Sequence, residues 1–309
     1  MPVLGLGAAT LGREINEKDS LHILDTAFAI GFRHFDTAEA YGGGNARAYR
    51  KNVLGIEDVR ETTATMHSSE ILLGQWVRDR GLRGEVQLAT KVSSGFRSAD
   101  VTAALERSLD RMGLDSIDLY YLHSIPKDIP LEEPLHSMKA ARHGGRIHSL
   151  GVSNATAAQL QHARKAATSI EYCQNAFNLA QAAQSRESLD YCRQQGIRFV
   201  AYSPLAAGFL TGKYGARGES VPSGTRFDVI PGHRDVYFND AGFHALTRLE
   251  QASAATKVPK HLLAMAWVLR HAEIAIVLVG ATKPDHLHNA VEAQKLATDE
   301  NLWTQLSGL

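Results

Sequence analysis

Four ionisable residues each lie where a predicted β-strand ends or in the loop after it: Asp36, Tyr41, Lys91 and His123. A tyrosine beside a lysine is a useful general acid, because a nearby ammonium favours the phenolate and lowers the phenol pKa from about 10. Asp36 would hold Lys91 charged and in place, and His123 can donate a hydrogen bond to a carbonyl oxygen. Each residue alone also suits a structural role, such as a loop-capping aspartate or a packed tyrosine. Their joint placement at successive strand ends favours one active site.

The chain alternates between strand-like apolar runs and amphipathic helical runs along nearly its whole length. Predicted strands cover residues 3–6, 32–35, 86–90, 117–122, 147–152, 170–173, 197–202 and 274–279. Predicted helices cover residues 20–30, 70–80, 100–112, 131–142, 155–166, 185–195, 261–271 and 284–297. Ser68 and Ser69 are candidate N-caps of the second of these helices.

This alternation calls for a parallel sheet with right-handed crossovers. About eight strand-then-helix units in a chain of this length favour a closed (β/α)8 TIM barrel, an α/β fold, over an open doubly wound sheet. The doubly wound alternative is weakened because GLGAATLG follows the first strand, and not a G-x-G-x-x-G turn that runs directly into a helix. Because no linker, low-complexity tract or charge block interrupts the chain, residues 1–309 are predicted to form a single domain.

Two long polar connections, residues 42–67 and 205–240, interrupt the regular alternation. Long connections without secondary structure in a compact domain are usually functional loops. In a barrel, both would lie at the C-terminal face of the strands and help to form a wall or a lid of the site. Four side chains of the first connection could therefore reach a substrate: Asn45, Arg47, Tyr49 and Arg50.

The composition is typical of a soluble globular protein, with 44% hydrophobic and 21% charged residues. The 33 basic residues balance the 33 acidic ones, so charge implies no nucleic-acid or membrane partner. No apolar run is long enough to span a bilayer, and the N-terminus lacks the features of a signal peptide. Cys173 and Cys192 favour neither a disulfide nor a metal site, so a cytoplasmic location is expected.

Seven stretches, in this order along the chain, resemble the aldo-keto reductase superfamily. They are GFRHFDTAEAYG (31–42), LATKV (88–92), DLYYLH (118–123), GGRIHSLGVSN (144–154), EYCQNAFN (171–178), AYSPLAAGFLTGKY (201–214) and VLVGATKPDHL (277–287). Their combination is highly specific, although each stretch alone is weak. The chain is more similar to bacterial sugar- and aldehyde-type members and to potassium-channel beta subunits than to short-loop aldose reductases.

The resemblance implies a barrel that holds an extended nicotinamide cofactor at its C-terminal face. It implies that Tyr41 donates a proton, that Lys91 paired with Asp36 tunes this tyrosine, and that His123 orients the substrate carbonyl. A hydride would pass directly between the nicotinamide and the carbonyl carbon. The residues implied to contact the cofactor are Ser153, Asn154, Gln174, Tyr202, Ser203, Leu205, Gly208, Lys213, Gly280, Thr282, Lys283 and His286.

The last of the seven stretches bears on which cofactor is preferred. Thr282 and Lys283 suit an adenosine 2′-phosphate, whereas Asp285 and Ala290 depart from the family pattern. The residues therefore favour NADP(H) and leave NAD(H) open. His286 and His288 are two positions apart and would face different sides of a helix, so no metal site is predicted.

These observations predict an NAD(P)(H)-dependent oxidoreductase that interconverts a carbonyl and an alcohol, with Tyr41 as general acid and base. The expected partner is a small sugar-like, polyol or bulky aldehyde or ketone substrate. The alternative is a cofactor-binding redox sensor or regulatory protein with little turnover, as in the channel beta subunits. The complete set of Tyr41, Lys91 and His123 favours the enzyme. The substrate, the direction of the reaction and the oligomeric state stay open.

Overall fold

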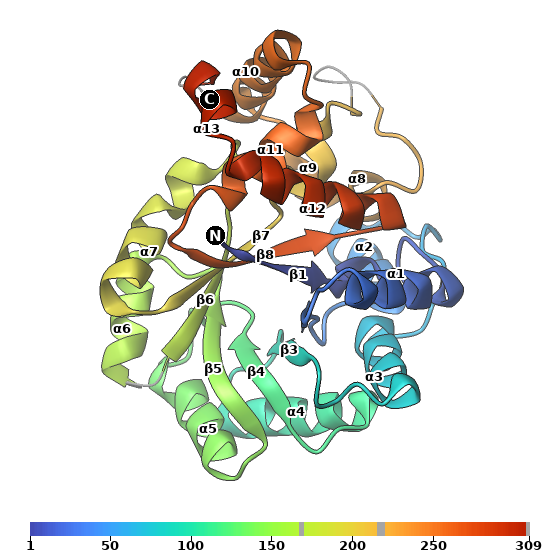
Figure 1. Ribbon diagram of the computed structural model, residues 1–309. Helices are drawn as coiled ribbons and strands as arrows, with labels where there is room; N and C mark the ends of the chain where they lie inside the picture. The colour runs from blue at the N-terminus through green and yellow to red at the C-terminus, as the bar shows by residue number, and fades with distance from the viewer. Residues whose placement is uncertain (167–169, 215–219, 307–309) are drawn as a thin grey trace.

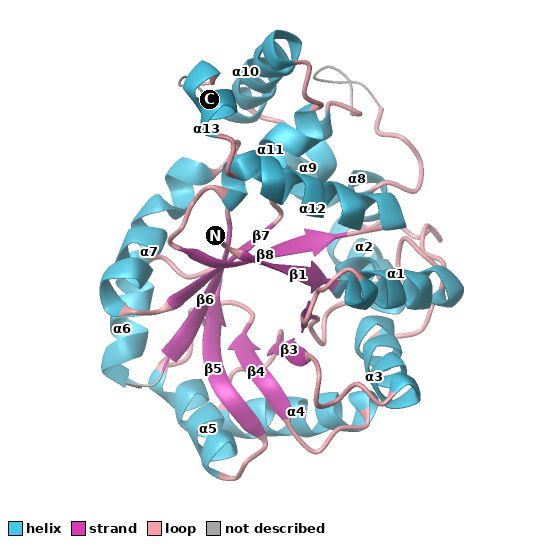
Figure 2. Cartoon of the chain, in the orientation of Figure 1, coloured by secondary structure: helices cyan, strands magenta, loops and turns pink. Residues whose placement is uncertain are grey.

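The computed structural model describes residues 1–166, 170–214 and 220–306. Within these residues, parallel strands close into a barrel in sequence order, and helices form a ring around it (Figures 1 and 2). The strands are β1 (Val3–Gly7), β2 (His34–Asp36), β3 (Gln87–Val92), β4 (Ile117–Leu122), β5 (Ile147–Ser153), β6 (Ile170–Ala176), β7 (Arg198–Tyr202) and β8 (Ile274–Gly280). Strand β8 pairs with β1 and closes the barrel. The predicted TIM barrel is confirmed, and the doubly wound alternative is wrong.

The helices that cover the barrel follow the predicted alternation. They are α1 (Glu17–Ala29), α3 (Ser68–Arg80), α4 (Ser98–Met112), α5 (Glu132–His143), α6 (Ala157–Ala166), α7 (Ala182–Gln195), α11 (Lys260–Leu269) and α12 (Pro284–Ala297). Helix α4 shows why these segments are helical, because its buried residues recur every three to four positions and face the strands. Its carboxyl end is capped by Gly113, whose φ of 62° is a left-handed conformation that glycine adopts without strain.

Two apolar layers hold the barrel together. The larger layer lies between the strands and the surrounding helices. The smaller layer fills the barrel interior and contains Ala89, Leu119, Tyr121, Tyr172, Val200, Ile276 and Leu278. Gly151 of β5 makes room for the Tyr121 ring, since a Cβ at this position would lie 2.4 Å from two ring carbons. The interior is therefore a packed core beneath the ends of the strands.

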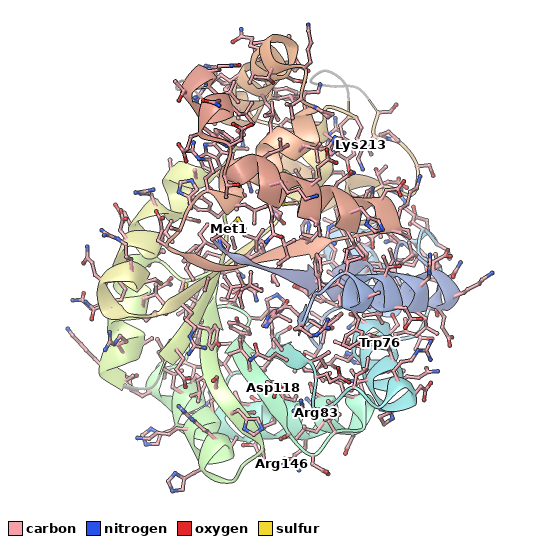
Figure 3. All side chains as sticks on the ribbon, viewed as in Figure 1. Met1, Trp76, Arg83, Asp118, Arg146 and Lys213 are labelled. Atoms are coloured by element: carbon pink, nitrogen blue, oxygen red, sulfur yellow. The ribbon has the colours of Figure 1, made fainter. Side chains whose placement is uncertain are left out.

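The two faces of the barrel differ in chemistry. Near the start of β4, Arg83 donates to Asp118 at 2.9 Å, and Asp118 also accepts the backbone N–H of Leu88 at 2.7 Å. Arg83 and Asp118 are labelled close together in Figure 3. Such contacts at the N-terminal ends of barrel strands stabilise the fold, whereas the residues predicted to do chemistry lie at the opposite ends.

The first long connection was predicted to lack secondary structure. This prediction is wrong, because the connection contains helix α2 (Gly43–Leu54). The start of α2 lies directly against the backbone of residues 63–66. A Cβ on Gly43 would lie 2.0 Å from the carbonyl oxygen of Thr63, so this approach requires glycine. Tertiary contact, rather than an apolar periodicity, therefore selects the helix.

The second long connection also contains short helices within its described part. They are η2 (Ala206–Thr211), α8 (Arg226–Val229), η3 (Pro231–His233) and α9 (Arg234–Tyr237). Residues 215–219 of the predicted connection lie outside the described residues. Helices α10 (Asp240–Thr256) and α13 (Glu300–Gln305) were not predicted, and neither was η1 (Ala8–Thr10).

The two serines predicted to cap the second helix do not do so. The N-cap of α3 is His67, with a left-handed φ of 57°, and both serines lie in the first turn. The Ser69 hydroxyl donates to the carbonyl oxygen of Ala8 at 2.8 Å. The Ser68 hydroxyl accepts the backbone N–H of Gly43 at 3.2 Å. These serines therefore join α3 to the loops that follow β1 and β2.

Candidate active site

Lys91 and Asp36 form a buried ion pair at the mouth of the barrel. The Lys91 ammonium donates to Asp36 and to the carbonyl oxygen of Thr37 at 2.6 Å, and its side chain is fully buried. The other Asp36 oxygen accepts the Gln174 side-chain amide at 2.7 Å. Two buried charges are tolerated when they are paired and their remaining positions are hydrogen-bonded, as they are here. The pair is thereby fixed in one geometry.

Tyr41 lies above this pair, in the turn that follows β2. Its backbone N–H donates to Ala38 at 3.0 Å, and Lys91 Nζ lies 5.1 Å from the centre of the tyrosine ring. Burial raises the pKa of Tyr41, and the charge of Lys91 only partly opposes this effect. The predicted lowering of the Tyr41 pKa is therefore wrong in its net direction, although the effect of the ammonium alone has the predicted sign.

His123 follows β4 and faces Tyr41 edge-on, with the two ring centres 5.5 Å apart and the planes at 83°. Burial, and then the charge of Lys91, lowers the pKa of His123 to about 3. The imidazole is therefore neutral at neutral pH. Its Nδ1 lies 2.7 Å from the Ser93 hydroxyl, and its backbone oxygen accepts the Asn154 side-chain amide at 2.8 Å. A neutral imidazole can donate one hydrogen bond to a ligand.

The structure brings four residues of the predicted cofactor site together beside this set. The Ser153 hydroxyl donates to the backbone oxygen of Gln174 at 2.8 Å, and the Tyr202 hydroxyl donates to the Asn154 side chain at 2.6 Å. Asn154 adopts a φ of 57°, which turns the chain sharply at the end of β5. Because the Gln174 amide binds Asp36, this glutamine also supports the ion pair. Contact of these residues with a nicotinamide stays a prediction.

The remaining predicted cofactor residues come from the ends of β7 and β8: Ser203, Leu205, Gly208, Lys213, Gly280, Thr282, Lys283 and His286. Partial burial, and then the charges of Lys213 and Lys283, lowers the pKa of His286. The Thr282 backbone N–H points to His286 Nδ1 at 3.3 Å. Neither lysine forms an ion pair within the described ranges. Figure 3 labels Lys213 on the loop after β7. Lysines that lie close together without forming an ion pair suit an anionic ligand.

Arg50, predicted to reach a substrate, is instead part of a clamp between the two long connections. Its guanidinium donates to both carboxylate oxygens of Glu61, at 2.5 and 2.8 Å, and to the Val229 carbonyl oxygen at 2.8 Å. Its neighbour Arg60 donates to Asp228, at 2.7 Å to the carbonyl oxygen and 3.0 Å to the carboxylate. Arg50 is fully buried and so cannot contact a substrate.

Arg13, in the loop after β1, is a further residue that the sequence prediction missed. Its guanidinium donates to both carboxylate oxygens of Glu14 at 2.7 and 2.9 Å. Glu14 Oε1 also lies 3.7 Å from Nη1 of Arg226 in α8. The Nε of Arg226 is in turn 3.4 Å from His233 Nδ1. Burial, and then the charge of Arg13, lowers the pKa of His233 to about 4. The β1 loop and the segment after β7 therefore meet near Tyr41, whose pKa the charge of Arg13 lowers.

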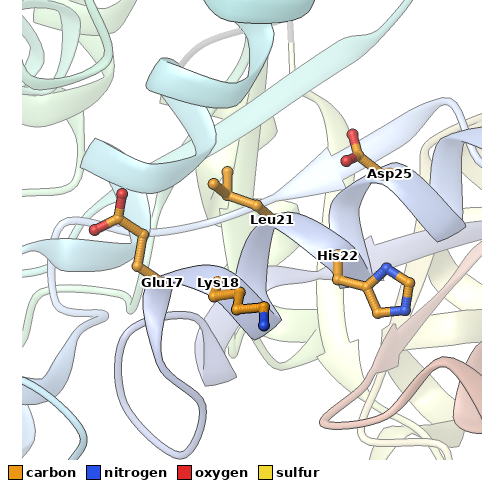
Figure 4. A pocket seen from close by; sticks show the side chains of 5 residues that line it. All are labelled: Glu17, Lys18, Leu21, His22 and Asp25. Carbon is orange, nitrogen blue, oxygen red and sulfur yellow. The ribbon is translucent and has the colours of Figure 1, made fainter.

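A hollow on the outer surface lies away from this chemistry. It is lined along helix α1 by Glu17, Lys18, Leu21, His22 and Asp25 (Figure 4). It contains none of the strand-end residues described above. Across the described ranges, no helix is both long and apolar enough to cross a membrane. In the same ranges, no group of three or more His, Cys, Asp or Glu side chains is arranged to hold a metal ion.

A tyrosine, a buried lysine–aspartate pair and a neutral histidine at the mouth of a TIM barrel are the kinds of group that general acid–base chemistry uses. The sequence model of the Aldo/keto reductase family matches residues 3–309. The chain belongs to this family, which places it among oxidoreductases that act on carbonyl compounds.

The chain is also similar to individual curated proteins. It is 27% identical over 293 residues to "Aldo-keto reductase yakc" of Schizosaccharomyces pombe, whose name specifies NADP(+), covering 88% of this chain and 85% of the relative. It is 27% identical over 328 residues to "Uncharacterized oxidoreductase YrpG" of Bacillus subtilis, covering 99% and 91%. It is 26% identical over 307 residues to "L-glyceraldehyde 3-phosphate reductase" of Escherichia coli O157:H7, covering 95% and 84%.

Proposed function

We propose that this chain is a single-domain, cytoplasmic, NADP(H)-dependent oxidoreductase that interconverts a carbonyl and an alcohol on a sugar-like, polyol or bulky aldehyde or ketone substrate. The observation that carries the proposal is the convergence of Tyr41, the Lys91–Asp36 pair and neutral His123 at one end of the barrel. The name of the Schizosaccharomyces pombe relative, which specifies NADP(+), supports the choice of cofactor.

The residues present fit a nicotinamide dinucleotide phosphate. Lys213, Lys283 and His286 interact electrostatically, and neither lysine forms an ion pair among the described residues, which suits a diphosphate or a 2′-phosphate. The turn after β7 holds Ser203 at a φ of 52° and Gly208 at 90°, so the backbone bends sharply at two of the residues proposed to contact the diphosphate. Ser153, Asn154 and Tyr202 would hold the nicotinamide end. When bound, the cofactor supplies or accepts the hydride.

The residues of the chain then account for the proton and for the orientation of the substrate. In reduction, the Tyr41 hydroxyl donates its proton to the oxygen of the substrate as negative charge develops there. Lys91 stabilises the tyrosinate that is left, and Asp36 keeps the ammonium in position. His123, being neutral, donates a hydrogen bond to the same oxygen and so fixes the carbonyl in line with Tyr41. In oxidation, Tyr41 accepts the proton instead.

A regulatory protein that binds cofactor with little turnover is the second candidate. The positioned Tyr41 and the fully buried Lys91 disfavour it, because binding a cofactor does not require a tuned acid. The two candidates share the cofactor site and differ in turnover.

The first experiment is a fluorescence titration of the purified protein with NADPH and NADH, followed by carbonyl substrates with the preferred cofactor. We expect saturable binding, tighter for NADPH, and turnover of at least one sugar-like or bulky aldehyde. Binding without turnover across the panel would favour the regulatory candidate. No binding of either cofactor at millimolar concentration would overturn the proposal.

A further inference from the structure

The Ser93 hydroxyl lies at one nitrogen of His123 and leaves the other nitrogen open. Ser93 Oγ is 2.7 Å from His123 Nδ1. Within the described part of the chain, Nε2 has no hydrogen-bond partner and is left for a ligand. A neutral imidazole carries its hydrogen on only one of these nitrogens, and the hydrogen bond at the other nitrogen decides which one. Ser93 is therefore placed to choose the tautomer of His123.

Ser93 is held in this place by Glu39, in the loop after β2. One carboxylate oxygen of Glu39 accepts the backbone N–H groups of Ser93 at 2.6 Å and of Ser94 at 3.1 Å. The backbone N–H of Glu39 donates to the carbonyl oxygen of Lys91 at 3.2 Å. Because Glu39 is only 5% exposed, this loop and the end of β3 form one fixed unit. His123 joins the same unit through its backbone N–H, which donates to β3 at 2.9 Å.

The tautomer matters because a carbonyl oxygen only accepts hydrogen bonds. If Ser93 donates to Nδ1, the hydrogen of His123 is on Nε2 and can be donated to the substrate. If Ser93 accepts from Nδ1, then Nε2 carries a lone pair that repels the carbonyl oxygen. The ring is neutral near pH 7, so only one of its two nitrogens carries a hydrogen there, and the tautomer decides which one.

We propose that Ser93 is a positioning residue for the reaction, and that its hydroxyl donates to Nδ1 of His123 and so keeps the hydrogen on Nε2. This proposal rests on the proposed function, because it assigns the Nε2–H to the substrate carbonyl. Ser93 itself does not contact the substrate. It acts through the ring of His123, supported by the carboxylate of Glu39.

The first test reads the tautomer directly and needs no activity. Protein with 15N-labelled histidine is studied by long-range 1H–15N NMR, and the His123 signals are identified by their loss in His123→Ala. We expect Nε2 of the wild-type protein to carry the hydrogen and Nδ1 to be unprotonated. We expect Ser93→Thr to preserve this pattern and Ser93→Ala to give a mixture of tautomers. A wild-type protein with the hydrogen on Nδ1 overturns the proposal.

The second test is kinetic. Loss of one neutral hydrogen bond in Ser93→Ala is expected to lower kcat about 3–10-fold with a smaller change in KM, and Ser93→Thr should restore kcat. Ser94→Ala is the matched control, because Glu39 binds only the backbone of Ser94. The Ser94 side chain is exposed and should not affect kcat. Added to His123→Ala, Ser93→Ala should cause no further loss. An equal loss in both backgrounds overturns the positioning role.

The two proposals can fail separately. If neither the wild-type protein nor any variant reduces a carbonyl with NADPH, the proposed function fails. The NMR experiment still decides the tautomer of His123 in that case. If wild-type activity is present but Ser93→Ala changes neither the tautomer nor kcat, the role of Ser93 is overturned and the oxidoreductase proposal stands.

Discussion

Replacing Arg50 by methionine should loosen the clamp between the two long connections. The Arg50 side chain is fully buried, and Glu61, its bidentate partner, is 1% exposed. In Arg50→Met, the Glu61 carboxylate keeps only the Arg60 backbone N–H at 3.2 Å, and the Val229 carbonyl loses its donor. Breaking a buried pair typically costs about 3–5 kcal/mol. We expect about 3 kcal/mol, because the second carboxylate partner, Asp58, is 34% exposed and can be hydrated.

The loss should appear first in the segments that the clamp joins. Hydrogen exchange of the amides in α2 and α8 is expected to accelerate, and the free energy of unfolding in urea to fall. Lys51→Met is the matched control, because Lys51 and its partner Glu57 are more than half exposed and their pair should contribute nothing measurable. Adding Glu61→Leu to Arg50→Met should recover much of the loss by removing the unpaired carboxylate. Unchanged exchange in α2 together with an unchanged urea midpoint would refute this reasoning.

Three further predictions concern the site. Tyr41→Phe should keep its affinity for NADPH and lose about 10²–10⁴-fold in kcat; retained turnover would move the acid role to His123. Because the charge of Lys91 lowers the pKa of Tyr41, Lys91→Met should raise it further and shift the pH profile of alcohol oxidation upward, and an unmoved profile would contradict this. The pKa of His233 is about 4 in the folded protein and about 6.5 in the unfolded chain, so only the unfolded chain gains this proton as the pH falls from 7 to 5. Stability should therefore fall by up to about 2 kcal/mol from this group, and urea unfolding of His233→Gln should lack that part of the fall.

The barrel, and the position of the candidate site residues at the ends of its strands, could be predicted because both depend on local patterns in the sequence. Strands buried on both faces read as continuous apolar runs, so Ile117–Leu122 was predicted with its observed bounds. The helix Pro284–Ala297 was also predicted as observed, since proline at its first position marks the start. Chemistry at the ends of such strands then places Lys91 and His123 at one mouth.

The long connections could not be predicted because their structure depends on partners far away in the chain. Helix α2 has few apolar residues and begins with glycines, so its sequence resembles a loop. Its largest buried side chain, Arg50, is hydrogen-bonded to Glu61 and to a carbonyl that lies 179 residues further along the chain. A contact of this kind produces no periodicity of apolar residues that could be recognised in the sequence. The same holds for Ser93, whose role is visible only once β4 places His123 beside it.

The pKa of Tyr41 shows why a list of candidate site residues does not give the electrostatics of the site. The sequence reveals a lysine near the tyrosine, and this implies a lowered pKa. It does not reveal how deeply the phenol is buried, and here burial has the larger effect and raises the pKa. A phenol that stays protonated above neutral pH is always ready to donate, which suits reduction. Oxidation needs the tyrosinate, so the enzyme should oxidise alcohols well only at alkaline pH. The charge of Lys91 lowers the Tyr41 pKa and so reduces the pH at which the tyrosinate forms.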